Sequence, residues 1–286
     1  MKLLSNYFKR AKQERWAIGH FNFSTEDQLK AFAEAAEESK SPVMVATSEG
    51  EAKFVGYKQA VVLVKSFGDT GLPIFLSADH HKSFESAKEA IDAGYDTVLI
   101  DASKLPYEEN IALTKKVVDY AKSVNPDIAV EGELGYLKGE SQIQETVEIS
   151  ADDYTKPEQA KDFVEKTGVD RLAIVFGNIH GIVVKQKERL DIGVLKTIVA
   201  AVPETILVLH GASGLLDADV REAIKNGISN VHVNTELRVA YMDALRKAVG
   251  KNPEQMTPYK VFADSFEVSK SLIKQKLELF GSVGKI

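Results

Sequence analysis

Short apolar runs alternate with longer amphipathic stretches along the whole chain. The runs are rich in β-branched residues and have the length of buried strands, whereas the stretches between them resemble helices in their periodicity. The eight predicted strands are Ala17–Phe23, Val43–Thr47, Ile74–Ala78, Thr97–Ile100, Ile128–Glu133, Leu172–Phe176, Ile206–Leu209 and Val231–Val233. Predicted helices between them include Thr25–Ser39, Phe84–Ala93 and Tyr107–Val124. Near-continuous apolar strands separated by helices predict a parallel sheet that is covered on both faces.

The number of βα units decides between two parallel architectures. Eight units within about 250 residues predict an α/β fold of the TIM (β/α)8 barrel type. An N-terminal helix and a C-terminal helix over Val261–Phe280 would be additions to that barrel. A doubly wound sheet would carry a Gly-rich fingerprint after its first strand, and G-H-F-N-F-S-T does not match one. We expect a single domain over residues 1–286, because no break in composition divides the chain.

Nearly every predicted strand ends on a side chain that can bind a metal, move a proton or donate a hydrogen bond. In chain order these are Asn22, Ser48, Asp79 with His80, Asp101, Glu131 with Glu133, His180, His210, and His232 with Asn234. The carboxyl ends of barrel strands form the rim that holds the active site in barrel enzymes. Several histidines converging on this rim predict a divalent metal site.

The segment after the seventh predicted strand adds a candidate anion site. It reads H-G-A-S-G over residues 210–214, where small residues allow backbone N–H groups to approach an anion and Ser213 offers a hydroxyl. Phosphate sites in barrels often use the loops after strands seven and eight, and Val233-Asn234-Thr235 supplies the second loop.

Composition and charge limit the kinds of metal ligand and binding partner that the protein can have. The chain has no cysteine, so a transition metal would be held by histidines and carboxylates. A net charge of −6 argues against a nucleic-acid surface, which would need a basic face. The N-terminus has no apolar signal-peptide core, and uncharged runs such as Thr205 to Leu216 are too short to span a bilayer. We therefore expect a cytoplasmic protein that binds neither nucleic acid nor membrane.

A metal on imidazoles beside an anion-binding loop can polarise a carbonyl and stabilise an enediolate, while a carboxylate moves protons. A Schiff-base lysine would reach the same carbon chemistry, but no lysine stands at the end of a predicted strand. A metal-dependent hydrolase on the same barrel is an alternative. It would want an H-x-H pair on the first strand and often a lysine on the fourth, where the chain has His20-Phe21-Asn22 and Ile100-Asp101.

Motifs spread over most of the chain resemble the class II, metal-dependent ketose-bisphosphate aldolases, the fructose- and tagatose-bisphosphate aldolase group. The resemblance runs from Asn22 to Gly281 in order and with similar spacing. The motifs include H-F-N-F-S, T-S-E-G-E-A-K-F-V-G, S-A-D-H, G-Y-D-T-V-L-I-D-A-S, V-E-G-E-L-G, Y-T-K-P-E-Q-A, F-G-N-I-H-G, V-L-H-G-A-S-G, V-N-T-E-L-R and L-F-G-S-V-G-K. The activity that this implies is reversible cleavage of a phosphorylated ketose into dihydroxyacetone phosphate and an aldehyde.

The resemblance also implies roles for individual residues. Asp79 matches the acid/base at the aldehyde oxygen. The three ligands of a catalytic zinc are matched by His80, His180 and His210, and carboxylates of a second or alternate metal position by Asp101 and Glu133. Residues matching the dihydroxyacetone-phosphate site, where a sodium or potassium ion commonly assists, are Gly181, Gly211, Ala212, Ser213, His232, Asn234 and Thr235. Asn22 and Ser48 match residues that line the substrate pocket. A homodimer or larger homo-oligomer is expected.

Three departures from the family pattern replace small or amide residues near the expected site. His81 stands where Gly is usual, and Ala212 stands where Gly is usual in H-G-G-S-G. His232 stands where Asn is usual, so it is expected to alter contacts to a substrate hydroxyl or to support another residue.

Other departures affect charged groups. The catalytic Glu of the mobile loop corresponds to Ser141, with Glu140 one residue earlier, so Glu140 is the candidate proton-transfer residue. The phosphate-binding lysine is displaced to Lys185. The chain has no arginine after Arg246 to grip a distal phosphate, and Tyr259-Lys260 occupies that region.

These departures spare the expected metal ligands and concentrate around the sugar. We therefore expect metal binding and enediolate chemistry to be retained, on fructose 1,6-bisphosphate or a related ketose phosphate, with the acceptor aldehyde as the part of the substrate most open to change. A non-catalytic barrel subunit that supports an aldolase partner is a further alternative. Its expected signature is loss of the zinc ligands, yet all three histidines are present.

Overall fold

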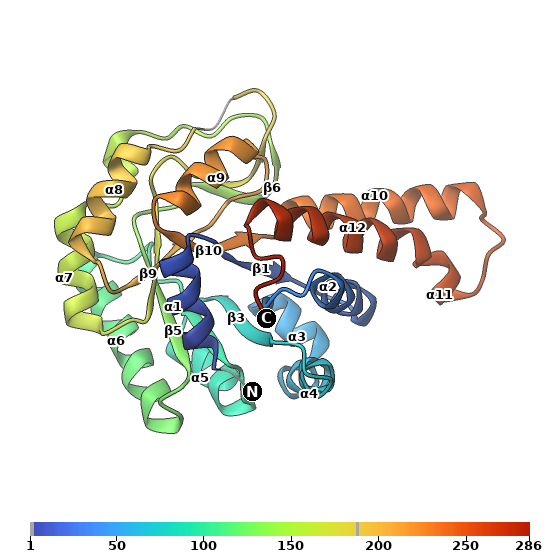
Figure 1. Cartoon of the computed structure of the whole chain (residues 1–286), viewed down its shortest axis with the longest axis horizontal. Coiled ribbons are helices and arrows are strands. Elements are labelled where there is room, and N and C mark those ends of the chain that lie inside the picture. Colours follow the sequence, from blue (N-terminus) through green and yellow to red (C-terminus); the bar gives the residue numbers. More distant parts are fainter. Residues whose placement is uncertain (1–2, 187–188) are drawn as a thin grey trace.

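The barrel is the central feature of the computed structural model, which describes residues 3–186 and 189–286 (Figure 1). Its strands are β1 Ile18–Asn22, β2 Val43–Ser48, β3 Ile74–His81, β4 Thr97–Ile100, β5 Ala129–Leu134, β7 Arg171–Ile174, β9 Ile206–Leu209 and β10 Ile228–Val233. They pair in parallel in the order β1-β2-β3-β4-β5-β7-β9-β10, and β10 closes on β1. The predicted TIM barrel is confirmed, and each of the eight predicted strands overlaps one of these.

Two strands outside the barrel were not predicted. β6, Gly139–Gln144, and β8, His180–Val183, form a separate parallel ribbon. Most of β6 is exposed, so it carries no apolar run that would mark a strand. His180 opens β8 and lies beyond the end of the sixth barrel strand, at which it was expected.

Helices alternate with the barrel strands along the chain, and most of them cover the outside of the barrel. They are α1 Leu4–Glu14, α2 Glu26–Glu38, α3 Glu49–Val55, α4 Tyr57–Gly68, α5 Phe84–Ala93, α6 Tyr107–Val124, α7 Pro157–Thr167, α8 Ile192–Ala201, α9 Asp217–Lys225, α10 Thr235–Lys251, α11 Pro258–Val261 and α12 Ala263–Leu279, with a 3₁₀ turn over Ala151–Asp153. Two predicted helices, α5 and α6, have the expected bounds. The C-terminal helix expected over Val261–Phe280 is α12, which follows the short α11.

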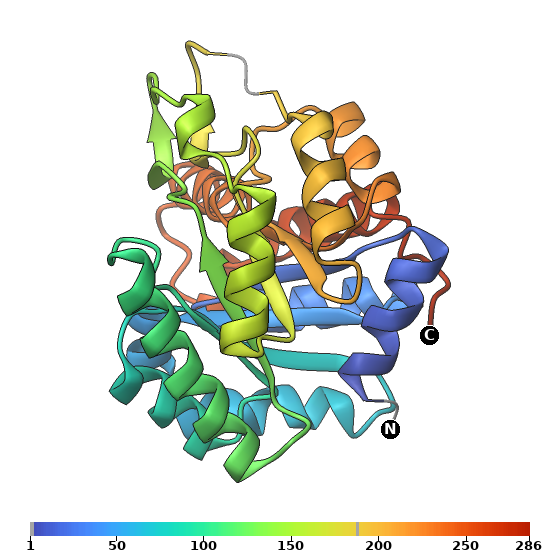
Figure 2. The ribbon, with the colours of Figure 1, turned by 90° about the vertical axis from the view of Figure 1, so that its left-hand side faces the viewer.

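Helix α1 closes the N-terminal end of the barrel. Its Tyr7 and Phe8 join a buried apolar cluster with Ile18, Met44 and Phe75 near the starts of barrel strands. Both chain ends lie on the same side of the molecule (Figures 1 and 2). The polar residues predicted at the carboxyl ends of the strands lie at the opposite end of the barrel.

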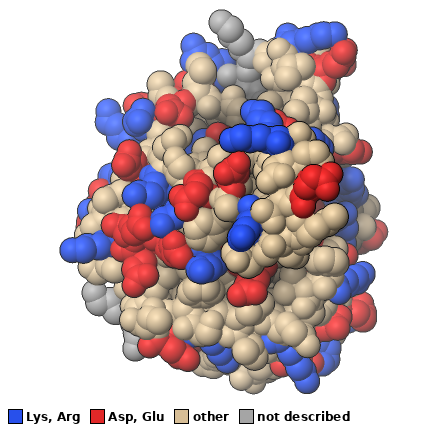
Figure 3. Space-filling view, turned by 90° about the vertical axis from the view of Figure 1, so that its right-hand side faces the viewer, with Lys and Arg blue, Asp and Glu red and all other residues tan. Residues whose placement is uncertain are grey.

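Helices α10, α11 and α12 form an arm that projects away from the barrel (Figure 1). Large apolar side chains on the arm are exposed, and the most exposed are Met256 at 82% and Tyr259 at 73%. Basic and acidic side chains are interspersed over the face in Figure 3. No helix in the described parts of the chain is both long and apolar enough to cross a membrane.

Candidate active site and metal centre

Side-chain alternation along the barrel strands brings the polar residues of the sequence into one cavity. Residues two apart on a strand share a face, which directs Glu131 and Glu133 of β5 toward the barrel axis together. At the rim lies a cavity of about 450 Å³, which Glu133 lines and Glu131 does not. Its lining includes the predicted residues Asn22, Ser48, Asp79, His80, Asp101, Glu133, Glu140, His180, Gly181, His210, Gly211, Ser213, His232, Asn234 and Thr235.

A backbone irregularity at the end of β3 lets consecutive residues serve the same cavity. The pairing of β3 with β4 shifts register between Ala78 and His81, and His80 has a φ of 48°, in the left-handed region. Such a conformation is unfavourable for a residue with a Cβ and is concentrated at functional sites. Asp79 and His80 therefore both line the cavity, although neighbours in a regular strand face opposite sides.

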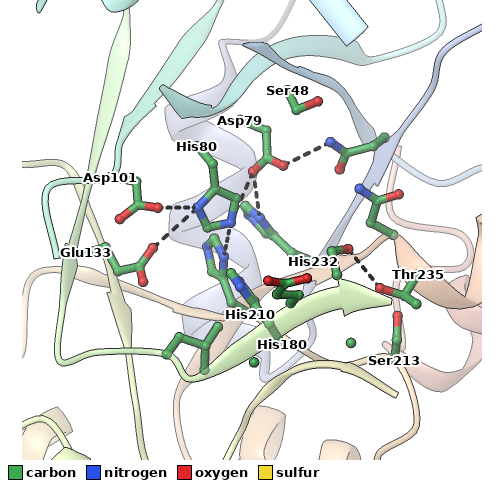
Figure 4. A pocket seen from close by; sticks show the side chains of 18 of the residues that line it. Ser48, Asp79, His80, Asp101, Glu133, His180, His210, Ser213, His232 and Thr235 are labelled. Carbon is green, nitrogen blue, oxygen red and sulfur yellow. Dashed lines mark hydrogen bonds and ion pairs between the residues drawn. The ribbon is translucent and has the colours of Figure 1, made fainter. Parts of the chain in front are cut away.

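Three histidines converge at the centre of the cavity (Figure 4). A ligand nitrogen from each of His80, His180 and His210 lies within 4.8 Å of the others. The Nδ1 atom of His210 and the Nε2 atom of His80 are 3.2 Å apart, and the rings of His80 and His180 meet edge to face. Three imidazoles that leave a position open suit a catalytic divalent cation such as zinc.

Two carboxylates approach the other side of the His80 ring. Its Nδ1 atom lies 3.0 Å from Asp101 Oδ2 and 3.6 Å from Glu133 Oε2 (Figure 4). These three residues form a second group of potential ligands. The Oε2 atom of Glu133 and the Oδ1 atom of Asp79 are buried without hydrogen-bond partners. Buried carboxylate oxygens normally have partners, so these orphaned atoms fit a site built around a bound cation.

The electrostatic environment shifts the pKa values of His80 and His180 in opposite directions. Burial alone would lower the pKa of His80, but the charges of Asp79, Asp101 and Glu133 raise it to about 10. For His180, burial and the neighbouring His80 and His210 lower the pKa to about 3. Burial and the charge of Asp101 raise the pKa of Glu133 to about 7. His180 is therefore already neutral at physiological pH, whereas His80 must lose a proton before it can bind a cation.

Asp79 occupies the inner wall of the cavity as a carboxylate. Burial opposes its charge, but nearby histidines, chiefly His80, hold the pKa of this carboxyl below its usual range. Its Oδ2 atom accepts a hydrogen bond of 2.9 Å from Asn22 Nδ2. The same amide donates to Glu51 Oε2 at 3.0 Å, and Glu51 closes a capping box with Ser48 at the start of α3. Asp79 is thus a fixed, ionised base with one free oxygen.

Glycines and hydroxyls form the opposite side of the cavity. Gly181 and Gly211 have φ values of 89° and 66°, and a Cβ on Gly211 would lie 1.9 Å from the carbonyl oxygen of Ile179. The Ser213 hydroxyl accepts a hydrogen bond from the backbone of Glu236 and keeps its own proton available. Thr235 Oγ1 lies 2.8 Å from Ser141 Oγ, on the ribbon that borders the cavity. These small and hydroxylic groups suit an anion such as phosphate.

Three sequence expectations change with the structure. Lys185 does not line the cavity, and its ammonium lies 2.8 Å from Glu145, in the exposed segments that follow the two strands of the ribbon. His81 is fully buried behind the barrel wall against Tyr57, so it does not reshape the substrate pocket. Ala212 is buried rather than part of the lining, and it adopts no positive φ, so the loop accepts alanine without strain.

The cationic group that sequence reasoning missed on the anion side is Arg238. It lies in α10 and lines the cavity, and its Nη2 atom donates to the backbone carbonyl and the hydroxyl of Ser141. It is the last residue of the V-N-T-E-L-R motif, one turn into the helix that follows β10. Other lining residues not singled out before include Glu51, Lys82, Ser103, Lys104 and Tyr136. The capping-box sequence S-E-G-E was the available signal for Glu51.

His232 contacts two other imidazoles through its ring, which is stacked on that of His20 and tilted against that of His210. Its ring lies parallel to that of His20, with centroids 3.5 Å apart and an angle of 4°, and its centroid is 4.1 Å from that of His210. Burial lowers the pKa of both His20 and His232 well below the ordinary value. His20 is fully buried, as expected for a packing residue, and both of its ring nitrogens lack hydrogen-bond partners.

Comparison with known proteins agrees with this geometry. The family model described as "Fructose-bisphosphate aldolase class-II" matches residues 2–285. A protein of Thermus caldophilus named "Fructose-bisphosphate aldolase" is 36% identical, with 97% of each chain covered. The chain belongs to the class II fructose-bisphosphate aldolase family.

Solved structures extend the comparison. The YdjI aldolase from Escherichia coli K12 is 34% identical with a TM-score of 0.84, covering 98% of this chain and 97% of that one. A putative fructose-1,6-bisphosphate aldolase from Coccidioides immitis is 26% identical with a TM-score of 0.85, covering 99% and 97%. The predicted family and the class II aldolase activity are confirmed, which decides against the hydrolase alternative.

Proposed function

We propose that this class II aldolase reversibly cleaves fructose 1,6-bisphosphate or a related ketose phosphate into dihydroxyacetone phosphate and an aldehyde. The observation that carries this proposal is one cavity in which three histidines, an ionised Asp79 and an anion-binding side meet. Relatives named for fructose-bisphosphate aldolase support the substrate class. Release of dihydroxyacetone phosphate from fructose 1,6-bisphosphate, followed through its enzymatic reduction, tests the proposal.

The proposed metal ligands are His80, His180 and His210, and zinc suits this all-nitrogen set. A divalent cation bound there would polarise the ketose carbonyl and offset negative charge on an enediolate. Asp101 and Glu133, with His80, would supply an alternate position. The buried, unpartnered Oδ1 atom of Asn234 lies on the anion side, where it is a candidate ligand for a sodium or potassium ion.

The proposed proton transfers use two carboxylates. In cleavage, the free oxygen of Asp79 takes the proton of the C4 hydroxyl, and the C4–O electrons form the aldehyde carbonyl. The C3–C4 bond breaks, and its electron pair remains with C3. Glu140, on the ribbon beside the cavity, then protonates that carbon to give dihydroxyacetone phosphate. Asp79 returns its proton to solvent, or to the aldehyde oxygen in the reverse reaction.

For the substrate phosphate, we propose Arg238 as the cation in place of Lys185. Its guanidinium lines the cavity beside Ser141, and its Nε atom is buried without a hydrogen-bond partner. Ser213, Thr235, Gly181 and Gly211 would complete the site. Arginine also suits phosphate through its paired N–H donors.

Proposals about the far end of the substrate and about assembly rest on other observations. Lys82 and Lys104 also line the cavity, and we propose that they bind a terminal anion of the acceptor aldehyde. The exposed Met256 and Tyr259 on the projecting arm support a homo-oligomer, because large apolar side chains on a projecting element favour burial. The molar mass in solution, compared with 31.4 kDa for one chain, tests assembly. The whole chain is proposed to act as a single domain.

A further inference from the structure

A buried arginine lies inside the barrel below the proposed metal site. Arg171 begins β7 and has no exposed surface. Its Nη1 atom lies 2.7 Å from Glu131 Oε2 and donates to Asn230 Oδ1 at 2.7 Å, while Nη2 donates to the hydroxyl of Thr97. On the closed side of the barrel, the ring of Phe8 packs 5.4 Å from the guanidinium carbon. The arginine is therefore held from both sides, with two acceptors fixed toward the cavity.

Glu131, the first acceptor, determines which ring nitrogen of His210 carries the proton. The other oxygen of Glu131 lies 2.7 Å from Nε2 of His210, and both side chains are buried. A carboxylate only accepts hydrogen bonds, so Nε2 of the neutral ring must carry the proton. The lone pair is then on Nδ1, the atom that lies 3.2 Å from His80 in the cavity. Glu131 thus selects the nitrogen that His210 offers to a cation.

Asn230, the second acceptor, determines which ring nitrogen of His232 carries the proton. The amide of Asn230 donates from Nδ2 to the backbone carbonyl of Ile18 at 2.8 Å, which fixes the orientation of the amide. Its Oδ1 atom accepts from Arg171 and lies 3.2 Å from Nε2 of His232. An amide oxygen is an acceptor, so Nε2 of this ring also carries the proton. The Nδ1 atom of His232 is left as an acceptor on the cavity side, 3.7 Å from Asp79.

We propose that Arg171 is a positioning residue that sets the tautomers of His210 and His232 together, through Glu131 and Asn230. Both rings then present an unprotonated Nδ1 atom to the cavity. In His210 this atom serves the cation, and in His232 it accepts a hydrogen bond from a hydroxyl of the sugar. The proposal rests on the proposed function for the identity of the two ligands. The substrate class that follows is a ketose phosphate with a hydroxyl donor at the His232 position.

A second metal position at His232 fits the geometry less well. His20, Asp79 and His232 have ligand atoms within 4.8 Å of one another. However, imidazole lone pairs lie in the ring plane, and the two rings are parallel at 3.5 Å. Their lone pairs therefore cannot converge on one ion. A hydrogen bond from a hydroxyl uses the lone pair of His232 alone.

Nitrogen NMR of the zinc-loaded full chain, labelled with ¹⁵N-histidine, tests the proposal directly. Two-bond proton–nitrogen correlations distinguish protonated, free and metal-bound ring nitrogens, and single His→Asn variants assign the signals. Protonated Nε2 atoms are expected in both rings, with Nδ1 metal-bound in His210 and free in His232. Protonation of Nδ1 in either ring overturns the proposal. This readout does not depend on aldolase turnover, so failure of the proposed function remains distinguishable.

The variant Asn230→Ala separates the two branches, because it removes the amide beside His232 and keeps both Arg171 and Glu131. Mixed tautomers are expected for His232 only, with KM for the ketose phosphate raised about tenfold, the effect of one lost hydrogen bond. Zinc affinity should stay within twofold of the wild type. An unchanged His232 tautomer in this variant contradicts the proposal. Arg171→Lys, which keeps the charge but cannot reach both acceptors, should alter at least one of the two rings.

Discussion

The rings of His20 and His232 lie parallel, with their centroids 3.5 Å apart. His20 supplies only a flat, fully buried surface, because neither of its ring nitrogens has a partner. His232, in contrast, lines the cavity. In this stacked pair, His20 therefore has a packing role, whereas His232 can contact the substrate.

Two replacements of His20 should distinguish the contribution of its ring packing to stability from that of its ring nitrogens. His20→Phe keeps a flat ring beneath His232 and removes two unpartnered polar atoms, so we expect the free energy of unfolding to change by less than about 1 kcal/mol. His20→Ala removes the support and should destabilise the protein by about 2–4 kcal/mol and raise KM. Denaturant unfolding and steady-state kinetics measure both effects. Equal losses in the two variants would show that the nitrogens of His20 matter.

Removal of one imidazole should abolish tight metal binding. His180→Ala leaves two histidine ligands, so we expect zinc affinity to fall by more than the roughly 10–100-fold that loss of an outer hydrogen-bond partner costs. Metal analysis after dialysis against a weak chelator measures the zinc content. Lys185→Ala is the control, because this exposed side chain lies outside the cavity. Zinc retained equally by both variants would disprove the proposed ligand set.

Zinc binding should release a proton across a defined pH range. In the metal-free protein the pKa of His80 is raised to about 10, so its ring stays charged above the ordinary value of 6.5. Zinc requires a neutral ring, so apparent affinity should increase with pH up to about 10. Calorimetry at pH 8 in buffers of different ionisation enthalpy should detect release of about one proton.

Asp101→Asn provides the matched comparison for this proton release. It removes the negative charge that helps to raise the pKa of His80 and replaces one carboxylate oxygen by an amide donor, so fewer protons should be released at pH 8. Binding without proton release by the unmodified protein would contradict the assigned charge state of His80.

Arg238 and Lys185 should differ sharply in their effect on phosphorylated substrates. Arg238→Ala removes the guanidinium from the cavity and should lower kcat/KM about 10- to 100-fold, the range for hydrogen bonds to charged groups. Lys185→Ala should leave kcat/KM within about twofold, and Arg238→Lys should be intermediate because lysine lacks the planar fork. The reverse order of effects would restore Lys185 as the phosphate ligand.

The barrel was predictable from sequence because its strands are continuous apolar runs. The ribbon of β6 and β8 was not, because β6 is polar and mostly exposed and carries no such signal. Tertiary packing alone decides that this polar segment pairs with the strand that begins at His180.

Most of the residues that line the cavity were predictable from their positions at the ends of strands, because the carboxyl ends of all parallel barrel strands lie at one rim. Contacts that depend on the direction in which a side chain points were not predictable from the sequence. His81 follows directly after a cavity residue but is turned behind the wall by the left-handed conformation of His80. Arg238 is a helix residue, and Lys185 is held away by Glu145, so the position of neither charge follows from spacing.

Dihydroxyacetone phosphate release from a panel of ketose phosphates and bisphosphates tests the central claim most directly. The panel includes fructose 1,6-bisphosphate and its C4 epimer tagatose 1,6-bisphosphate, assayed with the metal-free and the zinc-loaded protein. The zinc-loaded protein is expected to release dihydroxyacetone phosphate from at least one substrate of the panel, and chelation of the zinc should abolish this release. Asp79→Asn should lower the rate of release by at least about 100-fold. No release from any member with zinc bound would contradict the account and favour a non-catalytic barrel subunit.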